Sequence, residues 1–354
     1  MQKECELKMT PISFPFGTPP PEGEAIKVAE GILWMRLPLP MALDHVNVYA
    51  LRDGDGWCII DTGYNSKRGV QLWQNLLSGP LGGDPVTRVI LTHHHPDHMG
   101  MVGWFQSELG VELLATRTAW MYGRMMTLDT QNSWSQETLD FYLGAGIDAE
   151  IFAEWTSRSP RNFSEVCYDM PLGFSRIKDN DVITIGQRNW LVRCGDGHAP
   201  EHATLWSLSD EIIIAGDQVI PGISSNIGVY PTEPMADPLS EWIETCERFK
   251  TFATDEHFVL PGHKLPFKGL PTRLQQLIDN HNNSLPRLIE HLKIPRTAVG
   301  CFDVLYKRKI GSGEYSLALA EAVAHLNHLL LAGKVTRKMN NNHEWLWSVC
   351  NKDY

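Results

Sequence analysis

The stretch from Val89 to Gly100 constrains this chain more than any other part of the sequence. It begins as a short apolar run of the kind that forms a buried strand, and it then continues into the pattern His-x-His-x-Asp-His at His93, His95, Asp97 and His98. A loop that leaves a strand end can point alternate side chains into one cleft. His93 and His95 can therefore share one metal ion, while Asp97 and His98 turn toward a second. Imidazole and carboxylate groups suit zinc and also iron or manganese, so these donors alone do not select the metal.

Four further motifs accompany this stretch along the chain. They are Asp61-Thr62-Gly63 upstream and, downstream, Gly197-His198-Ala199-Pro200-Glu201-His202, Gly216-Asp217 after the apolar run 212–215, and Gly262-His263. In content and order, the five motifs together resemble those of the metallo-β-lactamase-fold superfamily, the group that includes the glyoxalase II hydrolases. The resemblance is specific to the superfamily and only weakly specific to any one member.

The resemblance implies two adjacent metal sites and assigns a role to each motif residue. His93, His95 and His198 would hold the first metal ion, Asp97, His98 and His263 would hold the second, and Asp217 would bridge them. Asp61 is expected to be a carboxylate that orients the ligand histidines rather than a ligand itself. Asp97 is expected both to bind metal and to help position a water molecule, so Asp97 and Asp61 are the candidate catalytic carboxylates.

Alternating strand-like and helix-like segments indicate an α/β fold with two sheets packed face to face and helices outside, the four-layer αββα sandwich of this superfamily. Strands are expected at 32–37, 46–52, 57–61, 89–92, 112–115, 181–185, 190–194, 203–208, 212–216 and 257–260. Helices are expected at 66–77, 99–109, 117–126, 136–156 and 238–251. We assign residues 1–268 to the catalytic domain and interpret the aromatic- and methionine-rich segment 117–170 as a helical insertion, with some side chains packing the domain and others forming a lid. Tyr122, Met126 and Trp134 are candidates for lining a pocket.

Residues 269–354 have a different character. Helical patterns at 270–293, 297–306 and 315–332 precede two strand-like runs, Lys334 to Lys338 and Glu344 to Val349. Three helices followed by a hairpin resemble a winged helix, a unit that also occurs in an endoribonuclease-like branch of the superfamily. We expect it to form a dimer surface or a pocket wall rather than to bind specific duplex DNA, because Ser316 to Ala332, the helix that would read the bases, contains no lysine or arginine.

Charge and composition argue against some classes of binding partner. From Leu270 onward eleven Lys/Arg outnumber seven Asp/Glu, a net of +4, whereas the preceding residues carry twenty against thirty-five, a net of −15. An acidic catalytic part argues against a nucleic-acid track across it. The absence of a long apolar run and of a secretion-signal pattern in Met1 to Gly17, together with seven scattered cysteines, predicts a cytoplasmic protein with reduced thiols and no membrane partner.

The remaining histidines are given ordinary roles. His94 is expected to point away from the metals, His202 to support a ligand or face substrate, and His45 to be structural. Six more have no ligand spacing and are interpreted as structural or surface residues: His257, His281, His291, His325, His328 and His343.

These residues predict a hydrolase that uses a hydroxide bridging two divalent cations, with zinc expected and iron or manganese as alternatives. We expect a small ester-like substrate, with a thioester or lactone ahead of a phosphodiester. Two alternatives stay open: an endoribonuclease or phosphodiesterase of the winged-helix branch, and a mononuclear iron dioxygenase, which shares the histidine motif. The sequence contains no Gly-x-Ser-x-Gly or Gly-x-Gly-x-x-Gly pattern, which removes two common rival enzyme classes.

Overall fold

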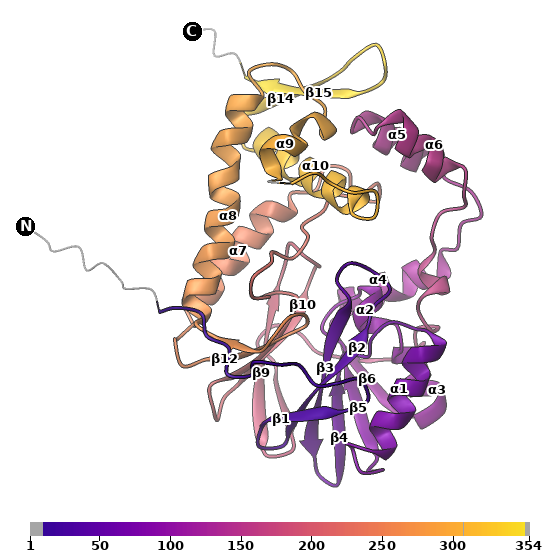
Figure 1. The fold of residues 1–354 in the computed structure, drawn as a ribbon, viewed down its shortest axis with the longest axis vertical. Coiled ribbons are helices and arrows are strands. Elements are labelled where there is room, and N and C mark those ends of the chain that lie inside the picture. The colour runs from indigo at the N-terminus through magenta and orange to yellow at the C-terminus, as the bar shows by residue number, and fades with distance from the viewer. Residues whose placement is uncertain (1–9, 307, 351–354) are drawn as a thin grey trace, which may run out of the picture.

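Two β-sheets packed face to face form the lower part of the molecule (Figure 1). The structure is a computed structural model and describes residues 10–306 and 308–350. In order across the first sheet, its strands are β1 (Ala25–Ala29), β2 (Ile32–Pro38), β3 (His45–Asp53), β4 (Gly56–Ile60), β5 (Val86–Ile90), β6 (Glu112–Ala115) and β7 (Ser175–Arg176). The second sheet runs β13 (Phe267–Lys268), β12 (Phe258–Pro261), β11 (Ile212–Gly216), β10 (His202–Ser207), β9 (Arg188–Gly195) and β8 (Val182–Ile185).

Strand side chains alternate between two cores, as the period of two in a strand requires. Trp34, Tyr49 and Ile60 belong to the core between the sheets, together with residues of the second sheet such as Trp190 and Ile214. Their immediate neighbours face the other way: Met35, Val48 and Ile59 belong to a second core on the outer face of the first sheet. Because both faces are buried, the central strands are largely apolar, and β4 (Gly56–Ile60) and β11 (Ile212–Gly216) contain no charged residue.

Helices cover the two outer faces. α1 (Lys67–Ser78) and α3 (Val102–Leu109) pack on the first sheet, and α7 (Pro238–Lys250) and α8 (Leu270–His291) pack on the second. Ser66 begins α1 by accepting a hydrogen bond from the Gly69 backbone N–H at 2.9 Å, the usual role of serine at this position. The predicted four-layer αββα sandwich is thus confirmed.

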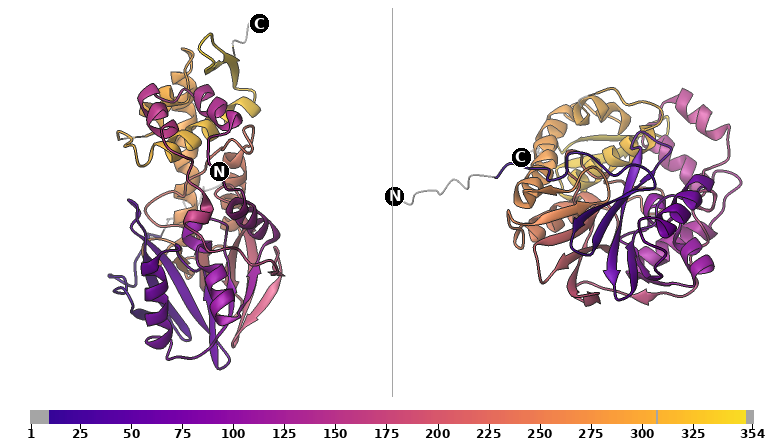
Figure 2. Two further views of the ribbon diagram at one scale, coloured as in Figure 1. Left: turned by 90° about the vertical axis from the view of Figure 1, so that its right-hand side faces the viewer. Right: turned by 60° about the horizontal axis from the view of Figure 1, so that its bottom comes forward.

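A helical cap stands above the sandwich, and α8 extends from one into the other (Figures 1 and 2). It contains a 3₁₀ turn η2 (Val299–Cys301), α9 (Phe302–Leu305), α10 (Tyr315–Leu331) and the hairpin β14 (Val335–Met339)–β15 (Trp345–Val349). The insertion begins with α4 (Arg117–Leu128), which packs on the first sheet through Ala119. It continues with α5 (Gln136–Gly144) and α6 (Ala149–Thr156), which lie beside the cap (Figure 1), and a 3₁₀ turn η1 (Phe163–Glu165) follows. Residues of α5 and α6 share one apolar core with α10 and β15.

Three expected helices differ in the structure. The helix expected at 99–109 is divided into α2 (Pro96–Met99) and α3, and the one expected at 136–156 is interrupted between α5 and α6. At that interruption Gly146 has φ +80°, and a Cβ on it would lie 2.4 Å from the Cβ of Thr297, so the chain turns there to admit the cap. Of the helix expected at 297–306, only η2 and the four residues of α9 form. The helix–helix–helix–hairpin order holds, whereas winged-helix geometry stays a prediction.

The strand directions bring the segments that follow several strands to one edge of the sandwich. In the first sheet β4 and β5 run parallel. In the second sheet β11 and β12 run parallel, and β9 shares the direction of these two because β10 is antiparallel to both β9 and β11. The two sheets meet at this edge, where Ala203 donates its N–H to the Thr92 carbonyl at 2.8 Å and Asn47 donates its N–H to the Gly262 carbonyl at 2.7 Å. The segments after all five strand ends therefore converge on one place.

Two sequence expectations lie partly outside the described residues. The segment Met1 to Gly17, in which no secretion-signal pattern was found, is described only from residue 10, and Cys5 falls among the residues without description. The six described cysteines are all free thiols, and five of them are buried. Within the described residues, no helix combines the length and apolar character that a membrane span requires.

Candidate metal centre

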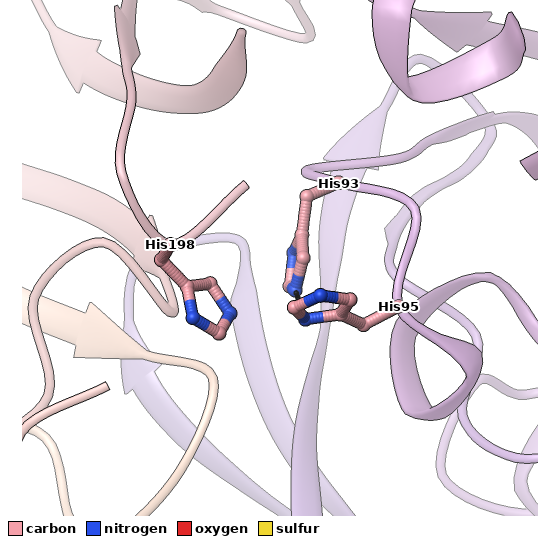
Figure 3. A group of neighbouring side chains, drawn as sticks. All are labelled: His93, His95 and His198. Carbon is pink, nitrogen blue, oxygen red and sulfur yellow. Dashed lines mark hydrogen bonds between the residues drawn. The ribbon is translucent and has the colours of Figure 1, made fainter. Parts of the chain in front are cut away.

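Three histidines from two separate loops form the first cluster. His93 and His95 follow β5, and His198 follows β9 from the opposite sheet, so their rings face one another across the edge of the sandwich (Figure 3). His93 Nε2 lies 3.0 Å from His95 Nδ1, and the His95 and His198 ring centroids are 4.5 Å apart. One donor atom from each lies within 4.8 Å of the others, which is the arrangement of three ligands around one ion.

Asp97, His98 and His263 form the second cluster. Asp97 and His98 lie on α2, directly after the first two histidines, and His263 follows β12. His263 Nε2 lies 3.3 Å from Asp97 Oδ2, and His98 Nε2 lies 3.6 Å from the same oxygen. These separations are those of donors that surround one cation.

Asp217, at the end of β11, lies between the clusters. Its Oδ2 is 3.6 Å from His198 Nε2 and 3.2 Å from His263 Nε2, and its Oδ1 is 3.4 Å from His98 Nε2. Gly262 makes room for this carboxylate, because a Cβ at that position would lie 2.2 Å from Asp217 Oδ1. The structure therefore brings all seven predicted ligand residues together, with Asp217 facing both groups.

Asp61 lies behind the metal-binding side chains and orients one of them, His98. It has φ +58° at the end of β4 and is 2% exposed. One carboxylate oxygen accepts from the Thr92 backbone N–H at 2.8 Å, and the other accepts from the Thr92 hydroxyl and from His98 Nδ1, both at 2.8 Å. With Nδ1 engaged, His98 directs Nε2 toward Asp97 and Asp217. This is the role expected of a carboxylate that supports a metal-binding histidine.

Two backbone carbonyls orient further ligands, and nothing in the sequence indicates either of them. His263 Nδ1 donates to the His45 carbonyl at 2.7 Å, and His198 Nδ1 donates to the Asn226 carbonyl at 2.8 Å. Both contacts leave Nε2 free to face the centre. Any residue type supplies a carbonyl, so only the fold reveals these partners.

Electrostatics divide the histidines into neutral and charged groups. Burial, assisted by the neighbouring histidines, holds the pKa of His93 and of His95 well below 6.5, so both are neutral. Burial also lowers the pKa of His263, but Asp217 and Asp97 outweigh it and raise that pKa to about 9. The same two carboxylates, with Asp61, hold the pKa of His98 well above its usual value despite burial. Protons on His98 and His263 thus occupy positions that cations would take between the carboxylates.

Buried polar atoms that have no hydrogen-bond partner show whether these residues fit metal ions. Among the described residues, His98 Nε2, His198 Nε2 and Asp217 Oδ1 are buried and have no hydrogen-bond partner. A buried polar atom without a partner is costly, and here all three converge on the positions that two cations would fill. The donor set is mixed imidazole and carboxylate, which suits divalent first-row metals. The residues fit the two ions that the motifs imply.

The other histidines near the centre have separate roles. His202 is fully buried and accepts a hydrogen bond at Nε2 from the Asp217 backbone N–H at 3.0 Å, so it supports a ligand. The His94 ring lies 5.0 Å from the Tyr122 ring of α4, tilted by 35°, and joins neither metal cluster. His45 bonds Asp44 at 2.6 Å and accepts from the Lys264 N–H at 2.9 Å.

The three pocket-lining candidates of the insertion lie in different surroundings. Tyr122 approaches the centre through His94, and Met126 is half-buried on the same helix. Trp134 instead stacks on Trp155 at 6.5 Å and donates its N–H to the Arg158 carbonyl at 2.8 Å, within the insertion itself. Only Tyr122 has a contact that leads toward the ligands.

Comparison with known proteins agrees with this geometry. Residues 41–263 match the family described as the Metallo-beta-lactamase superfamily, and residues 285–349 match the Metallo-beta-lactamase-like C-terminal domain. The first match includes all seven ligand residues and Asp61. The second covers most of the cap.

Individual relatives extend over nearly the whole chain. The crystal structure of a beta-lactamase domain protein from Burkholderia ambifaria is 34% identical, with a TM-score of 0.89 over 96% of this chain and 98% of that one. The "Probable metallo-hydrolase YqjP" of Bacillus subtilis is 25% identical over 88% of this chain and 96% of its own length. A metallo-beta-lactamase family protein from Thermus thermophilus shares the fold, with a TM-score of 0.73, 22% identity and coverage of 91% of this chain and 99% of that one. The chain belongs to the metallo-beta-lactamase superfamily.

Proposed function

We propose that this protein is a binuclear metallo-hydrolase that cleaves a small ester-like substrate, with a thioester or lactone favoured. The observation that carries the proposal is the convergence of seven imidazole and carboxylate side chains from the ends of four strands, with three buried donor atoms left without partners. A relative named a probable metallo-hydrolase supports the same reaction type. We further propose zinc as the metal, since the imidazole-rich first cluster suits it.

Each residue has a defined task in this proposal. His93, His95 and His198 would hold one ion, Asp97, His98 and His263 the other, and Asp217 would face both. Two divalent cations held by these residues would supply Lewis acidity and would lower the pKa of a bound water molecule, which would make a nucleophile available at neutral pH.

The Asp97 side chain is more open than those of three neighbouring ligands, 18% exposed against 8% or less for Asp217, His98 and His263. Its lowered pKa keeps it a carboxylate: burial opposes ionisation, but His98 and His263 outweigh that effect. A carboxylate at the open side of the centre can accept a hydrogen bond from water and hold it in line with a substrate carbonyl. Asp61 does not reach the substrate and acts by holding His98.

Charge and apolar surface support an acyl substrate ahead of a polyanion. Residues before Leu270 carry a net charge of −15, which repels a phosphate backbone. On α4, next to Tyr122, the side chains of Met121 and Met125 are 54% and 47% exposed. Exposed methionines adapt to apolar groups of varied shape, which suits an acyl chain.

A substrate panel tests the proposal. The zinc-loaded protein is assayed with an acyl-glutathione, an acyl-CoA, a lactone, bis-p-nitrophenyl phosphate and a short RNA. We expect turnover of at least one acyl substrate and slow or no turnover of the phosphodiesters. Efficient RNA or phosphodiester cleavage with no acyl activity would place the nuclease alternative first, and one iron per chain with oxygen consumption would place the dioxygenase alternative first.

A further inference from the structure

A second group of metal-binding side chains lies in the cap, away from the seven ligands. His281 comes from the middle of α8 and is fully buried, and His325 comes from α10 and is 3% exposed. Glu321 precedes His325 by four residues, so both project from the same face of α10. One donor atom from each of the three lies within 4.8 Å of the others. Sequence spacing could not show the group, because His281 is contributed by a different helix.

The two imidazoles have the separation of two ligands on one ion. His281 Nδ1 lies 3.2 Å from His325 Nε2. Two nitrogens bound tetrahedrally at about 2.0–2.1 Å from zinc are about 3.3 Å apart. In the metal centre, the corresponding distance between His93 Nε2 and His95 Nδ1 is 3.0 Å. The pair in the cap therefore matches the pair in the centre.

Orientation of the rings follows the same pattern. His325 Nδ1 donates to the Glu321 backbone carbonyl at 2.8 Å, which leaves the Nε2 lone pair directed toward His281. His198 is held in the same way by the Asn226 carbonyl at 2.8 Å. A ring N–H donated to a carbonyl is the usual support of a metal-binding histidine.

A hydrogen bond from His281 Nδ1–H to His325 Nε2 is the alternative to a bound ion. His281 Nε2 has no partner among the described residues in either arrangement, so it does not distinguish the two. A cation would use the facing nitrogens of both rings together with the Glu321 carboxylate, which the hydrogen bond between the rings does not involve.

Protonation favours the metal-binding forms. Burial lowers the pKa of His281 to about 3 and that of His325 to about 4, so both rings are neutral near pH 7. Burial raises the pKa of Glu321 to about 7, and a neighbouring cation would return this carboxyl to its ionised form. Two neutral imidazoles and one carboxylate form a donor set suited to a divalent first-row metal.

We propose that His281, Glu321 and His325 bind a third divalent transition-metal ion, of the Zn²⁺ class, that joins α8 to α10. The site has a structural consequence for the metal centre. Glu321 also accepts from the Asn226 side-chain amide at 3.4 Å, and the Asn226 carbonyl holds His198. An ion that fixes Glu321 therefore also steadies the loop behind one catalytic ligand. The proposal itself depends on neither the substrate nor the reaction.

Metal analysis of matched variants tests the site. The full-length protein and each variant are dialysed against Zn²⁺, passed through metal-free gel filtration and analysed for zinc per chain. We expect about three zinc ions in the wild type and about one fewer in His281→Phe, which preserves ring volume, and in Glu321→Gln, which preserves size and the contact with Asn226. His343→Asn, in the exposed hairpin turn, serves as the control and should keep all three ions.

A variant with a disabled centre separates this proposal from the proposed function. His98→Ala combined with Asp217→Ala should lose the ions of the centre and retain about one, which His281→Phe then removes. With cobalt in place of zinc, that remaining ion should give the visible absorption of a tetrahedral site.

Wild-type binding of two ions, with none left in the disabled variant, would overturn the third site and leave the hydrolase proposal standing. Binding of a single ion that survives in the disabled variant would support the third site and remove the binuclear centre. If His281→Phe does not fold, the Glu321→Gln variant tests the third site instead. A zinc content in Glu321→Gln equal to that of the wild type would count against the site.

Discussion

Asp97 and His94 are near neighbours on the same loop with opposite relations to the metal centre. Asp97 Oδ2 faces His263 at 3.3 Å and His98 at 3.6 Å, whereas the His94 ring packs against the Tyr122 ring. We predict that Asp97→Ala abolishes hydrolysis while the protein stays folded, because it removes a ligand and the open carboxylate together. His94→Ala should retain most of the turnover. Initial rates on the best acyl substrate, with circular dichroism as the check on folding, measure both.

Equal losses in the two variants would contradict the assignment of the loop. Zinc content sharpens the comparison, since Asp97→Ala should reduce it and His94→Ala should not. A fall in activity for His94→Ala at full zinc content would instead assign His94 to the substrate side of the centre.

Asp61 is expected to act on the metal through His98 alone. We predict that Asp61→Ala lowers metal affinity by about 10–100-fold, the usual effect of removing a group that orients a metal ligand. It should also destabilise the fold by about 1–3 kcal/mol, because the buried Thr92 N–H and His98 Nδ1 lose their acceptor. Competition with a chelating dye and urea unfolding measure the two effects. Asp61→Asn retains one oxygen acceptor and should recover part of the stability; identical values for both variants would argue against this role.

Residue type and position in the sequence indicated the side chains that converge on the centre. They did not indicate the backbone carbonyls that orient two of those side chains. All seven proposed ligands are histidine or aspartate at strand ends, so residue type and position both mark them. The carbonyls of His45 and Asn226 orient His263 and His198, but a carbonyl leaves no trace in residue type. The spacing of four residues between His198 and His202 suggested that His202 lies near the centre. It did not indicate that His202 accepts a hydrogen bond from the Asp217 N–H.

At the scale of elements, the junction between α2 and α3 fixes the ligand loop against the β4 end. A Cβ at Gly100 would lie 2.6 Å from the Gly63 carbonyl oxygen and 2.8 Å from the Asn65 nitrogen. We predict that Gly100→Ala destabilises the protein by about 1–3 kcal/mol through this overpacking and also lowers zinc content. Gly173→Ala is the matched control, because nothing lies within 4 Å of the added Cβ. Urea unfolding measures both, and equal midpoints would contradict the prediction.

Helix α7 begins with a carboxylate that stabilises it in a pH-dependent way. Asp237 accepts from the Ser240 N–H at 3.1 Å and from His328 Nδ1 of α10 at 3.1 Å. Burial opposes its ionisation, but these hydrogen bonds outweigh burial and place its pKa below 3.8. Its contribution is therefore complete above pH 3.8 and is lost as the pH falls through the lower folded pKa.

We predict that Asp237→Ala costs about 1 kcal/mol at pH 7, as expected for loss of a helix N-cap. The difference in unfolding free energy from the wild type should shrink below pH 3.8, where Asp237 takes up a proton. Urea denaturation between pH 7 and pH 3 tests this. A difference that stays constant over that range would mean that the carboxylate charge does not matter.

Most elements could be predicted from periodicity, and the failures have a common cause. The central strands and α1, α7, α8 and α10 carry clear apolar periods and capping residues. The helices that differ from expectation are interrupted where another segment approaches closely: Gly100 against Gly63, and Gly146 against Thr297. Local pattern does not contain that distant contact, although the glycines themselves mark where it could occur.

At the scale of the whole molecule, α5 and α6 of the insertion form one cap with the C-terminal segment. Phe141, Ala145 and Ile147 share a buried core with Leu319, Val323 and Trp347, which are far away in sequence. The sequence placed these segments in separate units, one as a lid and one as a winged helix, because periodicity shows which face is apolar and not what covers it. Whether the segment 117–170 moves as a lid stays a prediction.

The same packing removes the surface that a DNA-reading helix would need. Most of α10 is buried, including Leu319, Ala322, Val323 and Leu326, and the helix contains no lysine or arginine. Basic side chains elsewhere in the cap are partly neutralised: Lys293 pairs with Glu290 at 2.7 Å and Arg308 with Glu314 at 2.5 Å. The net charge of +4 is therefore dispersed rather than presented by one helix.

We predict that the full-length protein does not bind duplex DNA specifically, because base and phosphate contacts depend on exposed arginine and lysine. Fluorescence anisotropy with labelled duplexes of different sequence, at low and at physiological salt, measures this. Weak binding that is equal for all sequences and disappears with salt is the expected result, since it reflects dispersed charge alone. A duplex that binds in the micromolar range and much more tightly than the others would contradict the prediction. Binding that Lys334→Ala and Lys338→Ala abolish would then assign recognition to the hairpin rather than to α10.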